Sequence, residues 1–430
     1  MPADDATTTT ATVLAARAPA AARPPVIGDQ RLVKHINRMA LLRLLRGESG
    51  LSRADLAQRS GLTRSTVGAL IKELIDEGWL EEAAAAAAAR AGGGRGRRPT
   101  PLGLDSHRLL LVGAELGPDA ICAVTTSIRG EVLDMQMAPL RSTDPNQACR
   151  QLVQMITTLS SRVVQGGARL LGIGVAMPGA VDMRSGRLQF APNIGWRNLA
   201  VGPLLDAELA SAGFDGVPVY FHNEADLAAV GEIEFGARPA GEPLVYVSCG
   251  VGVGAGIMLK EGLFTGATGT AGEIGHNTLV IAGAPCSCGR LGCAEAYIGL
   301  RAIAAAADCL HGGAIDRAAL RVRMGSRHPA TRAAFAQAGR ALGVLLQNIW
   351  TTLNPTAMVL GGETVALGGE TFLDAAAGTL DEVARRAGVA PPELRLGRHA
   401  ERAAAVGGAG YVLHAILNPN QPALHTPYHP

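Results

Sequence analysis

The sequence predicts an α/β fold: a body of two lobes with a cleft between them, preceded by a small helical domain. From Leu109 onward, strand-like runs alternate with helical stretches, which is typical of mostly parallel sheets covered by helices. These strands gather in two regions of the chain, which indicates two lobes. The segment that follows Asp29 has instead the 3.6-residue periodicity of packed helices.

The composition is that of a globular protein in a reducing compartment. The 430 residues are 48% hydrophobic and include 55 glycines, with only 3% aromatics and a net charge of +2. A chain of this length can bury two or three domain cores. Its seven cysteines are an odd number, which suits a reducing cytoplasm better than a disulfide framework. Because it has no signal-peptide pattern and no run of 18 apolar residues, we expect a cytoplasmic protein without membrane spans.

The chain divides into four segments. Residues 1–27 are rich in Ala, Thr and Pro, so we expect a disordered tail. Residues 28–104 form the helical domain with a following hairpin, and residues 105–418 form the two-lobed body. Residues 419–430 are rich in Pro and are expected to be frayed.

The helical domain has the spacing of a helix-turn-helix. A first helix is expected from about Arg31 to Arg46. The run Ser52-Arg-Ala-Asp55 is a capping box that opens a second helix, which Gly61 ends. Thr63 caps a third helix, whose apolar residues repeat at the spacing of one buried face: Val67, Leu70, Ile71, Leu74 and Ile75.

This domain has the features of a winged helix that binds DNA. Short hydroxyl side chains and an Arg open the third helix, and these groups suit base edges and phosphates in the major groove. A strand at 79–82 is followed by an Ala/Gly loop and an Arg-rich stretch, as in a wing. The alternatives are the polar face of an ordinary three-helix core and a solvated linker. The residues predicted to contact DNA are Ser52, Arg53, Thr63, Arg64, Ser65, Thr66, Lys72, Arg95, Arg97 and Arg98.

The body begins with an antiparallel meander and continues with alternating helices and strands. Strands are expected at Leu109–Leu116, Ile121–Thr126, Glu131–Met137, Leu170–Val175, Val217–Phe221, Leu244–Val247, Ala255–Lys260 and Ala357–Leu360. Helices are expected near Asn146–Gln165, Ala225–Phe235, Ile298–Leu310, Thr331–Leu353 and Phe372–Ala387.

A metal site is predicted within Gly272–Glu295. One histidine and three cysteines lie within eighteen residues: His276, Cys286, Cys288 and Cys293. Such ligands suit a structural Zn²⁺ with four protein ligands and no open position. The alternative is a core histidine among small buried cysteines, which is common for isolated residues. Four ligands in this order, with Gly289 and Gly292 between them, favour zinc.

Six motifs in order resemble the ROK family (repressors, open reading frames and kinases), in its regulator branch with an N-terminal winged helix and similar to its xylose repressors. They are Ala176-Met-Pro-Gly-Ala-Val-Asp182, Pro192-Asn-Ile-Gly-Trp196, His222-Asn-Glu-Ala-Asp226, Gly250-Val-Gly-Val-Gly-Ala-Gly256, Gly272–Glu295 and Val359-Leu-Gly-Gly362. The resemblance covers about residues 30–415. It implies an actin-like (ribonuclease-H-like) two-lobed fold, a sugar in the cleft, and a homodimer or homotetramer.

The resemblance also implies which residues bind the sugar. They are Gly179, Asn193, Asn223, Glu224, Glu273, His276 and Glu295. Carboxylates, amides and a neutral imidazole supply the acceptors and donors that sugar hydroxyls require. His276 would serve twice, with one ring nitrogen on the metal and the other facing the sugar.

Two departures from the family's kinases predict sugar binding without phosphoryl transfer. A kinase of the family has Asp-x-Gly-Gly-Thr after the first strand, where this chain has Glu115-Leu-Gly-Pro-Asp119. Pro118 removes an N–H donor to phosphate. The catalytic Asp of the family is Glu224 here, and its extra methylene moves the carboxylate by about 1 Å, which costs on the order of a hundredfold in rate.

We therefore expect no enzymatic activity, but a repressor that leaves a palindromic operator when a monosaccharide binds. Glu224 is a trait of the family's xylose-type regulators, which places xylose ahead of glucose or an N-acetylhexosamine. The alternative is an active ATP-dependent sugar kinase with an added DNA-binding domain, because Gly250–Gly256 and a carboxylate at Glu224 are present.

Overall fold

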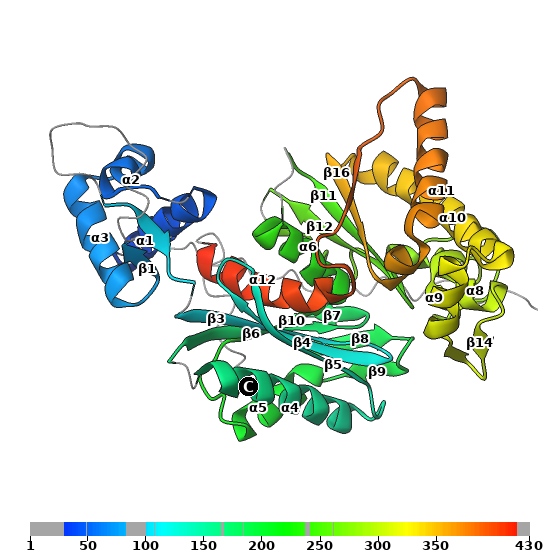
Figure 1. The fold of residues 1–430 in the computed structure, drawn as a ribbon, viewed down its shortest axis with the longest axis horizontal. Helices are drawn as coiled ribbons and strands as arrows, with labels where there is room; N and C mark the ends of the chain where they lie inside the picture. Colours follow the sequence, from blue (N-terminus) through cyan, green and yellow to red (C-terminus); the bar gives the residue numbers. More distant parts are fainter. Residues whose placement is uncertain are drawn as a thin grey trace, which may run out of the picture.

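A computed structural model describes residues 30–48, 50–82, 100–106, 108–164, 167–183, 185–236, 241–260 and 262–418. The small N-terminal domain lies beside a larger body of two lobes (Figure 1). The predicted tail, the predicted frayed end and the wing arginines Arg95, Arg97 and Arg98 lie outside the described residues.

The N-terminal domain has the predicted helices and the predicted caps. Its elements are α1 (Gln30–Gly47), α2 (Arg53–Ser60), α3 (Arg64–Asp76), β1 (Leu80–Glu82) and β2 (Leu102–Leu104). Ser52 and Asp55 form the capping box of α2, and Gly61 ends α2 in the left-handed region at φ 72°. The Thr63 side chain accepts a hydrogen bond from the Thr66 N–H and so caps α3. Strands β1 and β2 pair in antiparallel fashion, and β1 confirms the strand predicted at 79–82.

Lobe one is a five-stranded mixed sheet in the order β10-β6-β3-β4-β5. Its strands are β3 (Leu109–Leu116), β4 (Ala120–Ser127), β5 (Val132–Pro139), β6 (Arg169–Met177) and β10 (Val219–Asn223). Helices α4 (Pro145–Val164) and α5 (Val201–Ser211) cover one face of this sheet, and α12 (Ala403–Leu417) covers the other (Figure 1). A small sheet of β7 (Ala180–Asp182), β8 (Arg187–Ala191) and β9 (Trp196–Leu199) lies at its edge.

Lobe two is a second five-stranded mixed sheet, in the order β13-β12-β11-β16-β17. Its strands are β11 (Leu244–Cys249), β12 (Val253–Leu259), β13 (Gly262–Leu263), β16 (Ala357–Gly361) and β17 (Glu393–Leu396). Its helices are α7 (Glu295–Ile298), α8 (Leu300–Ala306), α9 (Arg317–Gly325), α10 (Pro329–Leu353) and α11 (Glu363–Ala387), with η2 (Ile274–His276) and the hairpin β14 (Leu310–His311) and β15 (Ala314–Ile315). Helix α6 (Glu224–Phe235) lies between the lobes, where it contacts both α12 and β12.

The body differs from the sequence prediction at several elements. The helix expected from Phe372 begins at Glu363 and has a kink at Gly369, where φ is 49°. The helix expected at Ile298–Leu310 is two short helices, α7 and α8. The prediction missed α12, which is buried on all sides, as well as α5 and α9. A helix that is apolar all round has no amphipathic period to detect.

Close backbone packing explains much of the glycine content. A Cβ at Gly113 of β3 would lie 1.8 Å from the Ala405 carbonyl oxygen of α12, so only glycine fits there. Among the described residues, no helix is both long and apolar enough to cross a membrane.

Candidate functional site

The side chains predicted to bind a sugar meet where β10 gives way to α6. Asn223 ends the strand and caps the helix, since its Oδ1 accepts hydrogen bonds from the Ala225 N–H (2.7 Å) and the Asp226 N–H (3.3 Å). Its Nδ2 donates to the Gly179 carbonyl (2.9 Å) and to Glu224 Oε2 (2.8 Å). The Asn223 amide is therefore fixed in one orientation, and Glu224 begins the helix beside it.

Gly252 lets two further predicted residues approach each other. A Cβ at Gly252 would lie 3.0 Å from Asn193 Nδ2 and 3.2 Å from Glu295 Oε2. Within the glycine run at 250–256, Gly252 thus leaves room for the Asn193 and Glu295 side chains in the cleft. At another position the run lets β12 pack on α6, since a Cβ at Gly256 would lie 2.3 Å from the Ala225 carbonyl oxygen.

Glu295 is oriented by two donors from other elements. Ser287 Oγ donates to Glu295 Oε1 (2.7 Å), and the Val253 N–H donates to Glu295 Oε2 (3.2 Å). Glu295 is only 8% exposed. The sequence prediction missed Ser287, whose only signal was its position between two cysteines.

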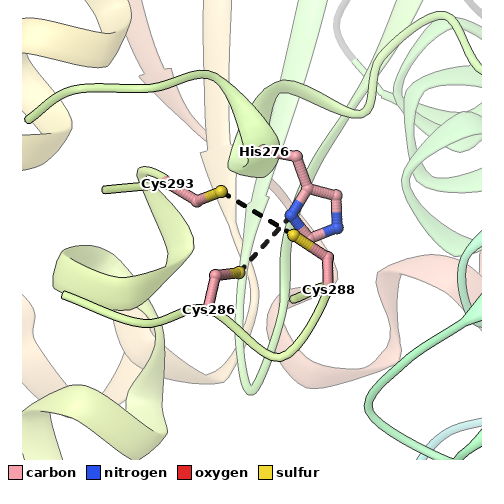
Figure 2. A group of neighbouring side chains, drawn as sticks. All are labelled: His276, Cys286, Cys288 and Cys293. Carbon is pink, nitrogen blue, oxygen red and sulfur yellow. Dashed lines mark hydrogen bonds between the residues drawn. The ribbon is translucent and has the colours of Figure 1, made fainter. Parts of the chain in front are cut away.

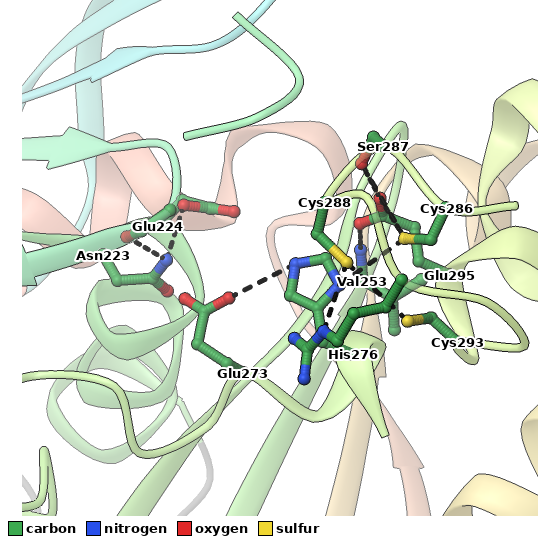
Figure 3. A network of polar contacts seen from close by, with 12 residues as sticks. Asn223, Glu224, Val253, Glu273, His276, Cys286, Ser287, Cys288, Cys293 and Glu295 are labelled. Atoms are coloured by element: carbon green, nitrogen blue, oxygen red, sulfur yellow. Dashed lines mark hydrogen bonds and ion pairs between the residues drawn. The ribbon is translucent and has the colours of Figure 1, made fainter. Parts of the chain in front are cut away.

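The opposite wall of the cleft comes from the loop that contains η2. Gly272 and Gly275 allow this loop to lie directly on β12, because Cβ atoms there would lie 1.9 Å from the Ala255 oxygen and 2.1 Å from the Val253 oxygen. The loop places Glu273 Oε2 3.8 Å from His276 Nε2. We name Asn223, Glu224, Glu273, His276 and Glu295 the cleft cluster. Figure 3 shows Glu273 between Asn223 and Glu224 on one side and His276 on the other, with Glu295 beyond His276 beside Ser287.

The cleft cluster is rich in carboxyl groups, and among the described residues the cation that acts on them is the exposed Arg290. Burial raises the pKa of Glu224 well above its usual range, and the neighbouring carboxylates of Glu273 and Glu115 add to this. Burial and the nearby Glu295 raise the pKa of Glu273 to about 7. Such carboxylates gain from a ligand that donates hydrogen bonds and lose from one that brings negative charge.

The four predicted metal ligands converge on one point. The ligand atoms of His276, Cys286, Cys288 and Cys293 all lie within 4.8 Å of one another (Figure 2). Cys288 Sγ is 3.8 Å from Cys293 Sγ, and Cys286 Sγ is 3.6 Å from His276 Nδ1. Tetrahedral zinc at its usual bond lengths separates its ligand atoms by about 3.5–3.8 Å. We call these residues the Cys/His cluster, and their chemistry and spacing fit Zn²⁺.

His276 belongs to both clusters and presents a different nitrogen to each. Nδ1 faces the thiol of Cys286, whereas Nε2 faces the Glu273 carboxylate in the cleft (Figure 3). The double role expected for this histidine is therefore geometrically possible.

Ion pairs cross the cavity beside the turn that follows β3. This cavity of about 620 Å³ lies between the lobes, lined by Glu115, Pro118, Glu224 and Gly250 among others. Arg317, at the start of α9, pairs with Asp119 of the β3–β4 turn (2.7 Å) and with Glu363 at the start of α11 (2.7 Å). Arg317 therefore ties the β3–β4 turn of lobe one to the starts of α9 and α11 in lobe two.

The outer face of α3 is the candidate DNA interface. Thr63, Arg64, Ser65 and Lys72 are exposed and Thr66 is half-buried. Arg64 has no ion-pair partner within the part of the chain that the structure describes, so its guanidinium is available to a phosphate or a base. Lys72 pairs with Asp76 (2.9 Å) on the same helix.

Two predicted DNA contacts at α2 have other partners in the protein. Ser52 is 5% exposed and its hydroxyl bonds to Asp55 (2.7 Å), so it caps the helix. Arg53 pairs with Glu82 of β1 (2.8 Å), an exposed contact that a phosphate could replace.

Comparison with known proteins agrees with this architecture. Residues 111–415 match the ROK family, and residues 35–81 match a winged helix-turn-helix DNA-binding domain. The xylose repressor of Bacillus subtilis (strain 168) is 31% identical over 339 residues, which are 78% of this chain and 84% of that protein. A solved ROK family transcriptional regulator, a homologue of the Escherichia coli MLC protein, has a TM-score of 0.72 at 23% identity and covers 90% of this chain and 98% of its own. A ROK family glucokinase from Streptomyces griseus, solved with glucose and AMPPNP, has a TM-score of 0.59 at 25% identity over 70% of this chain and 98% of its own.

A winged helix-turn-helix joined to a two-lobed body of the sugar-kinase type defines a class, the DNA-binding transcriptional regulators built on a kinase-like fold. The chain belongs to the ROK family.

Proposed function

We propose that this regulator is a cytoplasmic repressor that releases a palindromic operator when a free monosaccharide binds in its cleft. The cleft cluster is the observation that carries the proposal. Among the described residues, the cation that acts on its buried carboxyl groups is the guanidinium of Arg290, which is exposed. A neutral polyol supplies the hydroxyl donors that these groups need. A sugar phosphate would add negative charge to them.

Xylose is the effector that we put first. Glu224 stands where the family's kinases have Asp, and its longer side chain leaves less room for a ligand. A pentose lacks the exocyclic hydroxymethyl group of a hexose and so needs less room. The relative that is 31% identical is also a xylose repressor. Glucose and an N-acetylhexosamine are the alternatives.

A thermal-shift screen of the purified protein tests the effector. Free xylose, glucose, N-acetylglucosamine and their phosphates are compared at equal concentration. A ligand at a hundred times its Kd adds about 2.7 kcal/mol to the free energy of unfolding, which is easily measured. Glu224→Ala should abolish the shift by removing the side chain's hydrogen-bonding groups, whereas Glu81→Ala, on exposed β1, should not. A shift from sugar phosphates alone would contradict the proposal.

Operator binding is tested with DNA from the protein's own promoter region. We expect binding that weakens with salt and that Arg64→Ala weakens, because this exposed arginine opens α3. A homodimer or homotetramer would place two such helices on the two half-sites of a palindrome. Sugar that leaves the DNA affinity unchanged would refute the repressor assignment.

We propose that zinc has a structural role in the Cys/His cluster. His276, Cys286, Cys288 and Cys293 would hold it, and it would fix the loop that carries Glu273 and Ser287. Cys288→Ser, or treatment with a strong chelator, should lower the melting temperature and weaken sugar binding before it affects operator binding. Metal analysis that finds much less than one zinc per chain, with stability unaffected by chelation, would overturn this role.

The kinase alternative is favoured by the surviving carboxylate at Glu224 and the 620 Å³ cavity beside it. Incubation with ATP, Mg²⁺ and the sugar panel separates the two functions. We expect no sugar phosphate, because Arg317 bridges Asp119 and Glu363 in the phosphate region and Pro118 lacks an N–H. Clear formation of a sugar phosphate would refute this expectation.

A further inference from the structure

Two parallel helices connect the cleft to the DNA-binding domain. Helix α6 begins at the cleft with Glu224, capped by Asn223, and α12 begins beside the same cavity with Ala403 and Ala404. Both then run toward α1 of the winged helix. At about 1.5 Å per residue, α6 spans about 18 Å.

These two helices are packed too closely to move independently. A Cβ at Gly407 of α12 would lie 2.0 Å from the Leu227 carbonyl oxygen of α6, and one at Gly231 would lie 2.9 Å from Gly407 Cα. Farther along, Gly410 lies against Phe235. Backbones in direct contact leave no side-chain layer that could absorb a shift, so α6 and α12 form one rigid pair.

The pair ends in a buried ion cluster that reaches into the DNA-binding domain. Glu234, in the last turn of α6, is 8% exposed. It accepts a hydrogen bond from His414 Nδ1 (2.8 Å), in the last turn of α12, and it pairs with Arg46, in the last turn of α1. We name Arg46, Glu234 and His414 the Arg46 cluster. Three helix C-termini, each the negative end of a helix dipole, meet at the Glu234 carboxylate, and the Arg46 guanidinium compensates its charge.

Around the Arg46 cluster, apolar contacts join the winged helix and the two-lobed body in one shared core. The buried residues of the winged helix, including Leu41 and Leu45, belong to the same apolar core as Leu413 and Leu417 of α12. Apolar contact is non-directional and tolerates sliding. The charge cluster is directional, so it defines where α1 sits on the ends of α6 and α12.

We propose that the Arg46 cluster is the point at which sugar occupancy of the cleft is coupled to the DNA-binding domain, through movement of α6 and α12 as a unit. This rests on the proposed function. A sugar that draws Asn223 and Glu224 toward its hydroxyls displaces the start of α6, and the rigid pair carries that displacement to Glu234. Arg46 then moves α1 with it and changes the position of α3 on the operator. Glu234 and Arg46 are positioning residues, since neither lies in the cleft.

The test measures the ratio of operator Kd with sugar to operator Kd without it. The sugar is D-xylose, or the free monosaccharide selected by the thermal-shift screen. Couplings between two sites are typically about 5- to 150-fold. We expect Glu234→Gln and Arg46→Met to bring this ratio of operator Kd values below about threefold. Both variants should still bind the sugar, as measured by calorimetry, and should still bind the operator when no sugar is present. Arg46→Met retains an apolar stem and serves if Glu234→Gln does not fold.

The matched control is Glu232→Gln. Glu232 lies on the same turn of α6 and is 6% exposed, but it bonds to the Arg398 N–H (2.8 Å), away from α1. This variant should keep the wild-type ratio. The inference is overturned if folded Glu234→Gln and Arg46→Met also keep the wild-type ratio. A wild-type protein that binds operator but shows no response to any free sugar overturns the proposed function itself, and the inference with it.

Discussion

Replacing Glu115 with glutamine should make the protein more resistant to unfolding at neutral and mildly alkaline pH. Glu115 lies near the end of β3 at the cavity, and burial raises its pKa from 4.5 to about 7. Between these two values the folded state holds a proton that the unfolded chain has lost. The contribution of Glu115 to stability is therefore greatest below pH 4.5, falls as pH rises through about 7 and is constant above it, a loss that glutamine avoids.

The magnitude follows from the displaced pKa. A change of one pKa unit corresponds to about 1.4 kcal/mol, so the raised pKa of Glu115 corresponds to a loss of about 3 kcal/mol of stability at high pH. Glu115 is only partly buried, so solvent reduces this to about 2 kcal/mol. The removal of its charge also eases ionisation of Glu224, which acts in the same direction.

Urea-induced unfolding at pH 5 and pH 8 is the assay. We expect the stability advantage of Glu115→Gln over the wild type to grow by about 1.5 kcal/mol from the lower to the higher pH, because about a quarter of the effect is already present at pH 5. Glu81→Gln, on exposed β1, should show no such growth. An advantage of equal size at both pH values would refute the reasoning, because it would mean that Glu115 is not protonated in the folded state.

Three further substitutions test the packing and the cleft. Ser287→Ala should weaken sugar binding by about tenfold through the loss of the hydrogen bond to Glu295, with zinc content unchanged, as calorimetry and metal analysis would show. Gly113→Ala should lower the free energy of unfolding by more than about 3 kcal/mol, because the new Cβ would meet the Ala405 carbonyl oxygen. A melting temperature within a degree of the wild type would contradict this close packing of β3 on α12. Gly68→Ala, in α3 with nothing near its Cβ, should instead raise stability by about 0.5–1 kcal/mol in the same measurement.

Local signals explain what could be predicted from the sequence. Ser52, Gly61 and Thr63 act within one turn of the helices that they cap, so their roles can be read from neighbouring residues. The Cys/His cluster was predictable because its four ligands lie in one short segment whose glycines allow it to close.

Contacts between distant segments explain what could not be predicted. Arg46 and Glu234 are 188 residues apart and neither has a local pattern that marks it. Ser287 reaches Glu295 only because the loop folds back around the Cys/His cluster. Ser52 has the capping role that its sequence predicted, with its hydroxyl bonded to Asp55 inside the domain, and its contact with DNA stays a prediction.

The place of α12 has a consequence for how the protein is made. Strands β3 and β6 and helix α6 all pack against α12, and the apolar core of the winged helix reaches it as well. Yet α12 leaves the ribosome after every other described element, so the nascent chain must hold an open apolar sheet face until residues 403–417 have been made. A chain cut short before residue 403 would expose this apolar sheet face and aggregate, and it would not fold into a DNA-binding regulator with a single function missing. Only chains that include α12 are therefore expected to fold and to bind DNA.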